Sequence, residues 1–437
     1  MSVKSHLKLK LSAALCLTAL SAPSFAQTLA VSSSTNCLRM SDVLQLSADR
    51  SPSVLISRGF EAEADTQITQ ARSLFQPRVS AFGRSGAGDT GIVDSGVSNQ
   101  AGLRASQRIF DFGDAKYARR SARSNFEASV EDTKQARLSA ARDTGNTFLS
   151  LLEAEEQIAL TSRRRDYFAR QLAATDKLLQ GGAATRTERA AVASQLADAE
   201  SFVLELEFRR ESALAQVQID TEASVNHCAS EIESNNLLKT KLLLLQNEEV
   251  AAQSAIANNP NVRALAKRAD GLEADKEREQ RSRLPVIEVV ATGAYSSLGG
   301  FDQFEFQERI GLNVSVPIFA GNSITAARKG AGAREAIARG RVLDAQRRLR
   351  KDVSIGYRRI ASLEKQLKRR QEVENQTLLQ FEAAELEQNA GTKTLRDLIE
   401  IRLEYEEAGL QTIRTKYDLE RQRLSLLSMT AALPIKG

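Results

Sequence analysis

Two carboxylates, Asp397 and Glu400, are the side chains of this sequence best placed to act together. They are three residues apart, so a helix would present them on one face. They follow segment 391–394, where Gly391 suits the end of one helix and Thr394 suits the start of the next. The spacing therefore predicts a helical-hairpin turn followed by two carboxylates on one face of the next helix.

Other reactive side chains are too few for a catalytic or metal site. After residue 26 the chain has one histidine, His227, and two cysteines, Cys37 and Cys228. These residues do not have the spacing of metal ligands, and no stretch gathers a nucleophile, a base and oxyanion donors. We therefore expect no enzyme activity, no metal and no cofactor. In an oxidising compartment Cys37 and Cys228 either form a disulfide or stay as two buried thiols.

Residues 1–26 have the composition of a signal peptide. Lys4, Lys8 and Lys10 precede an apolar run at 11–20, and small residues at 24–26 form a cleavage site. The run is too short to cross a bilayer as a helix. Removing these three lysines from the 60 basic residues leaves 57 against 55 acidic ones, a net charge of +2. This charge gives no argument for a nucleic-acid partner.

The rest of the chain is a duplicated unit. Four landmarks recur in the same order at an offset of 208 or 209 residues: 51–54 with 259–262, 77–79 with 285–287, 108–110 with 317–319, and Gly182 and Thr185 with Gly391 and Thr394. We therefore divide the mature chain into a first repeat at 27–236 and a second at 237–437. Each repeat is expected to contain a helix, a β-hairpin, a long helix, a turn near 182 or 391, and a further helix.

Long helices are predicted from the spacing of apolar residues in the second repeat. Steps of four and three, the seam of a coiled coil, connect Leu349, Val353, Gly356, Ile360, Leu363 and Leu367. A step of seven connects Leu403, Leu410, Tyr417 and Leu424. No proline interrupts 323–389, so this helix would be roughly 100 Å long at ~1.5 Å per residue. The low aromatic content of 5% also favours long helices over a compact domain.

A strand is predicted at 309–319, where apolar and polar residues alternate over about ten positions. This strand is expected to pair with segment 285–295, which gives a hairpin at 285–319. In the first repeat, segments 77–84 and 101–110 are expected to pair as a hairpin at 77–110. The intervening segments 85–100 and 296–305 are expected to be loops. A strand that is apolar on one face fits a transmembrane barrel, although a half-buried soluble strand has the same pattern. Four strands cannot close a barrel, so several copies would have to share it.

The signal peptide, the duplication, one hairpin per repeat and the long helices together resemble the TolC-like outer-membrane factors over nearly the whole mature chain. Segment 38–43 with Ser51 and Pro52 resembles the amino-terminal helix of that family, and 317–319 with Gly321 resembles its strand-to-helix corner. The run 391–400 resembles the family's periplasmic hairpin turn. The sequence departs from the family pattern at Gln388, where a tyrosine is expected, and at Arg108, where a proline is expected.

The resemblance implies roles for residues around the two turns. Asp397 and Glu400 match positions that form acidic rings at the closed inner end of the tunnel. Lys393 and Glu188 match the basic and acidic partners of a closing lock. The adaptor would contact the turns at Gly182, Thr185, Gly391 and Thr394. The alternative is that these are ordinary solvated side chains of exposed helices.

We therefore predict a mainly α-helical fold with a transmembrane β part. Four β-strands per protomer would contribute to a trimeric twelve-stranded β-barrel on a long α-helical periplasmic barrel in the Gram-negative outer membrane. The homotrimer would contact outer-membrane lipid, a periplasmic adaptor and an inner-membrane ABC or proton-driven pump, but no nucleic acid. It would be a passive exit channel for type I protein secretion or for small-molecule efflux. The alternative function is a periplasmic coiled-coil adaptor or tether without a channel.

Overall fold

The computed structural model describes residues 39–88, 96–223, 238–239, 247–298 and 305–435. The predicted signal peptide, Cys37 and Cys228 lie outside these residues. The fold below is that of the described residues within the unit 37–437. Among its described helices, none combines the length and apolar character needed to cross a membrane.

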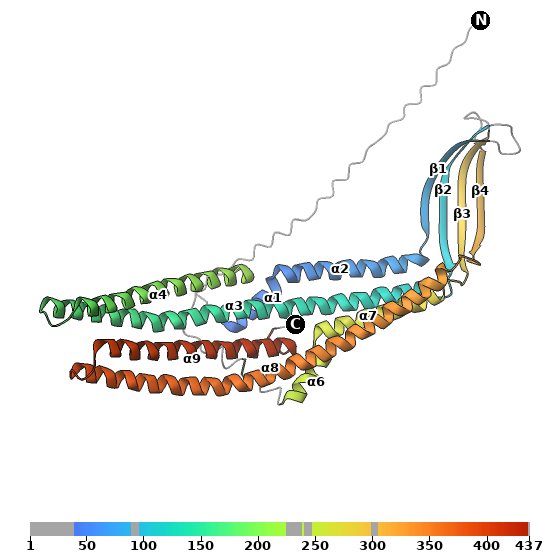
Figure 1. The fold of residues 1–437 in the computed structure, drawn as a ribbon. Coiled ribbons are helices and arrows are strands. Elements are labelled where there is room, and N and C mark those ends of the chain that lie inside the picture. The colour runs from blue at the N-terminus through green and yellow to red at the C-terminus, as the bar shows by residue number, and fades with distance from the viewer. Residues whose placement is uncertain (1–38, 89–95, 224–237, 240–246, 299–304, 436–437) are drawn as a thin grey trace, which may run out of the picture. The chain divides into compact units, whose positions relative to one another are not determined.

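The helices and strands described in the two repeats follow the same order, apart from one short 3-10 helix in the first repeat (Figure 1). The first comprises α1 (Met40–Arg50), α2 (Pro52–Arg72), the short 3-10 helix η1 (Ser73–Phe75), β1 (Arg78–Gly88), β2 (Gly96–Phe110), α3 (Asp114–Gln180) and α4 (Arg186–Thr221). The second comprises α6 (Glu248–Asn258), α7 (Pro260–Gln280), β3 (Val286–Leu298), β4 (Glu305–Ser315), α8 (Ser323–Asn389) and α9 (Leu395–Met429). Proline is the first residue of both α2 and α7, where its missing N–H leaves no hydrogen bond unmade.

The four strands form one antiparallel sheet in the order β1-β2-β3-β4. Pairing between β2 and β3 joins the two repeats. The strands differ in extent from the prediction. Pairing of β1 with β2 begins at Gly88 and Gly96, so it includes residues that were predicted as a loop. Strand β4 ends at Ser315, before the predicted end. A ladder uses backbone groups alone, so small residues continue it. Pro317 has no N–H to donate, which fits the early end of β4.

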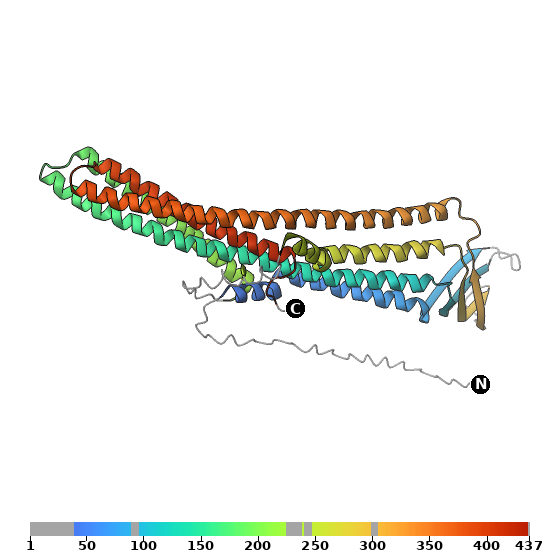
Figure 2. The same cartoon turned by 90° about the horizontal axis from the view of Figure 1, so that it is seen from below.

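The helices pack along one another as two long hairpins. Helix α4 folds back on α3, α9 folds back on α8, and α3 contacts α9 (Figures 1 and 2). Nearer the sheet, α2 and α7 take the places of α4 and α9 beside α3 and α8. The predicted seams are confirmed, because their central side chains are buried: Val353, Ile360 and Leu363 of α8, and Leu410, Tyr417 and Leu424 of α9.

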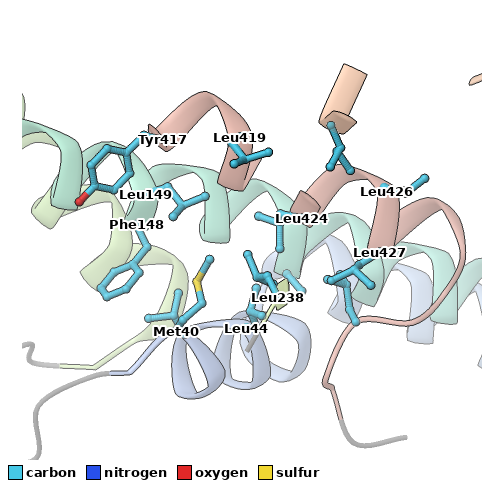
Figure 3. Close-up of a cluster of buried hydrophobic side chains, with 14 of the residues drawn as sticks. Met40, Leu44, Phe148, Leu149, Leu238, Tyr417, Leu419, Leu424, Leu426 and Leu427 are labelled. Carbon is cyan, nitrogen blue, oxygen red and sulfur yellow. The ribbon is translucent and has the colours of Figure 1, made fainter. Parts of the chain in front are cut away.

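The largest apolar core lies where α1 meets the middle of α3 and the end of α9. Figure 3 shows its leucines gathered with Met40 and Phe148. Gly145 of α3 permits this approach, because a Cβ there would lie 2.9 Å from Cδ2 of both Leu44 and Leu424. This core holds the short α1 in place where α3 of the first repeat packs against α9 of the second.

Candidate functional site

The two turns that reverse the helical hairpins share one backbone geometry. Gly182 follows α3 with a φ of +70°, and Gly391 follows α8 with a φ of +77°. The next amide donates to a carbonyl five residues back, from Ala183 at 2.8 Å and from Thr392 at 3.0 Å. This is the Schellman motif, whose left-handed residue is sterically unstrained only as glycine. Each predicted turn glycine therefore sets the geometry of its reversal.

Both turns end in the same helix cap. The hydroxyl of Thr185 accepts from the backbone N–H of Glu188 at 3.1 Å, and the Glu188 carboxylate accepts from the Thr185 N–H at 2.7 Å. Thr394 and Asp397 repeat this exchange at 3.2 and 3.4 Å. Such a capping box satisfies two backbone donors that a helix start leaves free. The two threonines singled out in the sequence thus begin α4 and α9.

The capping box also engages two of the predicted charged residues. The backbone N–H of Thr185 donates to Glu188 and, with the Thr185 hydroxyl, holds the pKa of that carboxyl below its ordinary value. Asp397 is half-buried in the equivalent place, while Glu400, one turn later, is exposed. Glu400 lies 3.7 Å from Arg396 in a loose ion pair. The two predicted carboxylates are therefore close together on α9 but differ in their partners.

The predicted lock residues are not paired with each other in the single chain. Nζ of Lys393 lies 3.0 Å from Oε2 of Glu387, at the end of α8. Glu188 belongs to the cap of α4. Among the ion pairs of the described residues, none joins Lys393 to Glu188, so a lock between them would require Lys393 to exchange its partner.

Behind the turns, a buried aromatic cluster joins the two hairpins. We call it the tip cluster; it comprises Tyr167, Phe168, Val192, Phe381, Ala384, Leu398 and Ile399. Its side chains come from α3, α4, α8 and α9. The Tyr167 ring meets Phe168 and Phe381 edge to face, with centroids 5.4 and 5.6 Å apart. Because such contacts depend on ring geometry, the cluster fixes how the two hairpins lie against each other.

A buried cation packs against two rings of the tip cluster. The guanidinium of Arg402 is 4.8 Å from the ring centroid of Tyr167 and 4.7 Å from that of Phe381. Its Nε lies 2.7 Å from Oε1 of Glu406, whose other oxygen is 3.2 Å from Nε of Arg164. Arg402 is 8% exposed and Glu406 3%. A desolvated cation between aromatic faces is strongly held, and here it contacts both hairpins.

The sequence analysis missed this group. Its signal is that Arg402 and Glu406 interrupt the apolar face of α9 between Leu398 and Gly409. Further along the same interface, α9 is tied to α3 by ion pairs of Lys416 with Glu156, at 2.7 Å, and of Arg421 with Glu153. The described residues contain no group of three or more metal-binding side chains placed to hold an ion.

One protein family matches segments in both repeats. The model of the family described as "Outer membrane efflux protein" matches residues 43–219 and 251–432. Among curated proteins, none matches the sequence.

Solved structures of outer-membrane channels share the fold. The Campylobacter jejuni CmeC channel is 18% identical, with 90% of this chain and 85% of that chain covered and a TM-score of 0.74. The outer membrane protein VceC of Vibrio cholerae is 15% identical, with 90% of this chain and 96% of that chain covered and a TM-score of 0.72. The Neisseria gonorrhoeae MtrE channel in its open state is 16% identical, with 91% of this chain and 90% of that chain covered and a TM-score of 0.74. At these identities the likeness concerns the fold.

Proposed function

Because this chain belongs to the outer membrane efflux protein family, we propose that it forms the exit channel of a tripartite export machine. Membership places it in the Gram-negative outer membrane with its helices in the periplasm, and it excludes the alternative of a tether without a channel. The family is one of channels and not of enzymes. The energy for export would come from an inner-membrane pump, which a periplasmic adaptor connects to this channel.

The sheet carries this proposal. One face of the sheet is apolar and exposed, as shown by Val79 and Leu103, and Ile310 on the same face is 81% exposed. Within the described chain, β1 and β4 each pair on one side only. Backbone groups in lipid must be paired, because no water is present to bond them. A lipid-facing sheet with two open edges therefore needs further copies of itself.

Exposed apolar side chains on the helices favour the same assembly. Because α3 and α9 lie between α4 and α8, the latter two helices form opposite borders of the protomer. Both borders carry exposed apolar residues: Leu204, Phe208 and Ile219 on α4, and Ile355, Leu379 and Leu386 on α8. We propose that the border of one copy packs on that of the next in a homotrimer, with about twelve strands closing one barrel.

The periplasmic end would be closed by the hairpin turns. In the trimer, Asp397 and Glu400 would form a negative ring around the axis, and Lys393 would leave Glu387 to pair with Glu188. A partly exposed ion pair contributes at most about 1 kcal/mol, so a partner protein can open it. The adaptor would bind the turns at Gly182, Thr185, Gly391 and Thr394 and rotate the helices outward.

The channel is tested by purification from outer membranes, heat-modifiable migration on a gel and conductance in planar bilayers. We expect a trimer that conducts ions. A monomer found in the periplasm and without conductance would overturn the proposal.

The cargo depends on the pump. Loss of a large secreted protein from the medium of a deletion strain, with unchanged drug tolerance, would identify type I secretion. Drug hypersensitivity with an unchanged set of secreted proteins would identify small-molecule efflux.

A further inference from the structure

The register of the sheet assigns its side chains to two faces. Directly paired residues lie on the same face, and one row across the four strands is Ser80, Arg104, Thr292 and Arg309. Alternate residues of each strand from this row belong to the same face. The opposite face holds the exposed apolar side chains described above. All the strand arginines thus share a single face of the sheet.

The face with the arginines is the hollow one. A concavity on the sheet is lined by Ser80, Arg84, Gln100, Arg104, Thr292 and Arg309, among others. Figure 1 shows the strands curving along their length. Closure of such a sheet with further copies turns the concave face inward and the convex face to lipid. The arginines would then line the passage.

The charge of this concave face is positive on balance among the described strand residues. Arg108, at the end nearest the helices, is neutralised by Asp111, Asp114 and Glu288 at 3.2 to 3.8 Å. Above it, the register places Arg78, Arg84, Arg104 and Arg309 on this face with one acid of the described strands, Glu305. Glu308 also lines the concavity, so four arginines face two acids among the described residues.

Arg104 and Arg309 are free to act on a solute. Both are exposed, and within the described residues neither forms an ion pair. They lie two strands apart in one row, roughly 10 Å at the usual strand spacing. Guanidinium groups with no carboxylate to neutralise them leave their donors available to another anion.

We propose that the concave face of the sheet is an anion-binding wall, with Arg104 and Arg309 as its main contacts, and that it favours solutes carrying several carboxylate or phosphate groups. The proposal rests on the proposed function, since closure of the passage needs several copies. Guanidinium binds such groups through paired hydrogen bonds, and rings of arginine make pores anion-selective. Three copies would place six row arginines around one passage. Its polarity is opposite to that of the Asp397 and Glu400 pair at the turns.

The test uses the full-length trimer in planar lipid bilayers, with inorganic tripolyphosphate added to each chamber in turn. We expect block of the current from the chamber that faces the sheet. Arg104→Gln/Arg309→Gln should raise the half-blocking concentration of tripolyphosphate severalfold. Each single substitution should raise it by a smaller factor, so the single variants still test the proposal if the double variant does not fold. The matched control is Arg348→Gln/Arg369→Gln, which removes two exposed arginines of α8 and should leave the block unchanged.

Charge reversal supplies the reciprocal test. Arg104→Glu/Arg309→Glu should abolish block by tripolyphosphate and create block by spermine from the same chamber. Equal block of wild type and glutamine variant, or an equal shift in the control, would overturn the anion-binding wall and leave the channel standing. A wild-type protein that never conducts would overturn both proposals.

Discussion

The Nε atom of Arg402 lies 2.7 Å from Oε1 of Glu406 inside the protein, where the α3–α4 and α8–α9 hairpins meet. Arg402 also faces Tyr167 of α3 and Phe381 of α8. One side chain therefore contacts both hairpins. Movement of one turn relative to the other must strain or break these contacts, because an aromatic cage holds a cation only at short range.

Loss of Arg402 should destabilise the hairpins more than loss of the pair. Arg402→Met leaves the Glu406 carboxylate buried with only Arg164 nearby, and we expect a loss of about 3 kcal/mol. Arg402→Met/Glu406→Leu removes both charges and should recover much of this loss. The measurement is the thermal unfolding of each trimer in detergent. A double variant as unstable as the sum of the two single variants would contradict a coupled pair.

The threonine caps should set the local stability of the turns. Thr185→Ala removes the acceptor for the Glu188 N–H, and a lost cap costs typically about 1 kcal/mol. Hydrogen exchange of the first turn of α4 should accelerate accordingly, while Thr185→Ser retains protection. Thr394→Ala should act in the same way on α9. Unchanged exchange in both alanine variants would show that packing alone fixes these helix starts.

The turns and the helices could be predicted from the sequence because their determinants are local. Gly391 and Thr394 lie three residues apart, and the seam of α8 repeats every three or four residues. The strand bounds were less accurate, since pairing of residues such as Gly88 and Gly96 depends on the partner strand and not on side-chain pattern. The predicted strand at 309–319 accordingly lies at 305–315 in the structure.

The tip cluster could not be predicted in this way. Arg402 and Glu406 are four residues apart, a spacing that is typical of exposed ion pairs on a helix surface. Their burial depends on Tyr167 and Phe381, which are distant in sequence. The partner of Lys393 was equally hidden, because Glu387 and Glu188 are both acidic residues near a turn and only geometry separates them.

Acidification should loosen the start of α4. The pKa of Glu188 is lowered in the folded chain, so its stabilising effect is present above the unfolded-state pKa of about 4.3 and is lost as the pH falls through the folded value. Protection of the first turn of α4 from hydrogen exchange should differ between wild type and Glu188→Gln at neutral pH. This difference should vanish at low pH, and a difference independent of pH would argue against the carboxylate.

A new charge should impair assembly on one face of β4 and not on the other. Ile310→Arg places a cation on the convex face, where contact with lipid near the bilayer midplane costs about 2–4 kcal/mol. We expect less assembled trimer in outer-membrane fractions. Asn313→Arg, on the concave face of the same strand, is the control and should assemble normally. Equal loss in both variants would contradict the assignment of the faces.

Reversal of the charge at Lys393 should open the periplasmic end if Lys393 pairs with Glu188 in the closed trimer. Lys393→Glu and Glu188→Lys should each raise single-channel conductance, because either change sets like charges against each other. The exchanged double variant should return to the low conductance of wild type. Glu387→Gln removes the partner seen in the single chain and should have no effect. Low conductance in every variant would mean that the closed end is held by other contacts, of which the Arg402 cage is the first to test.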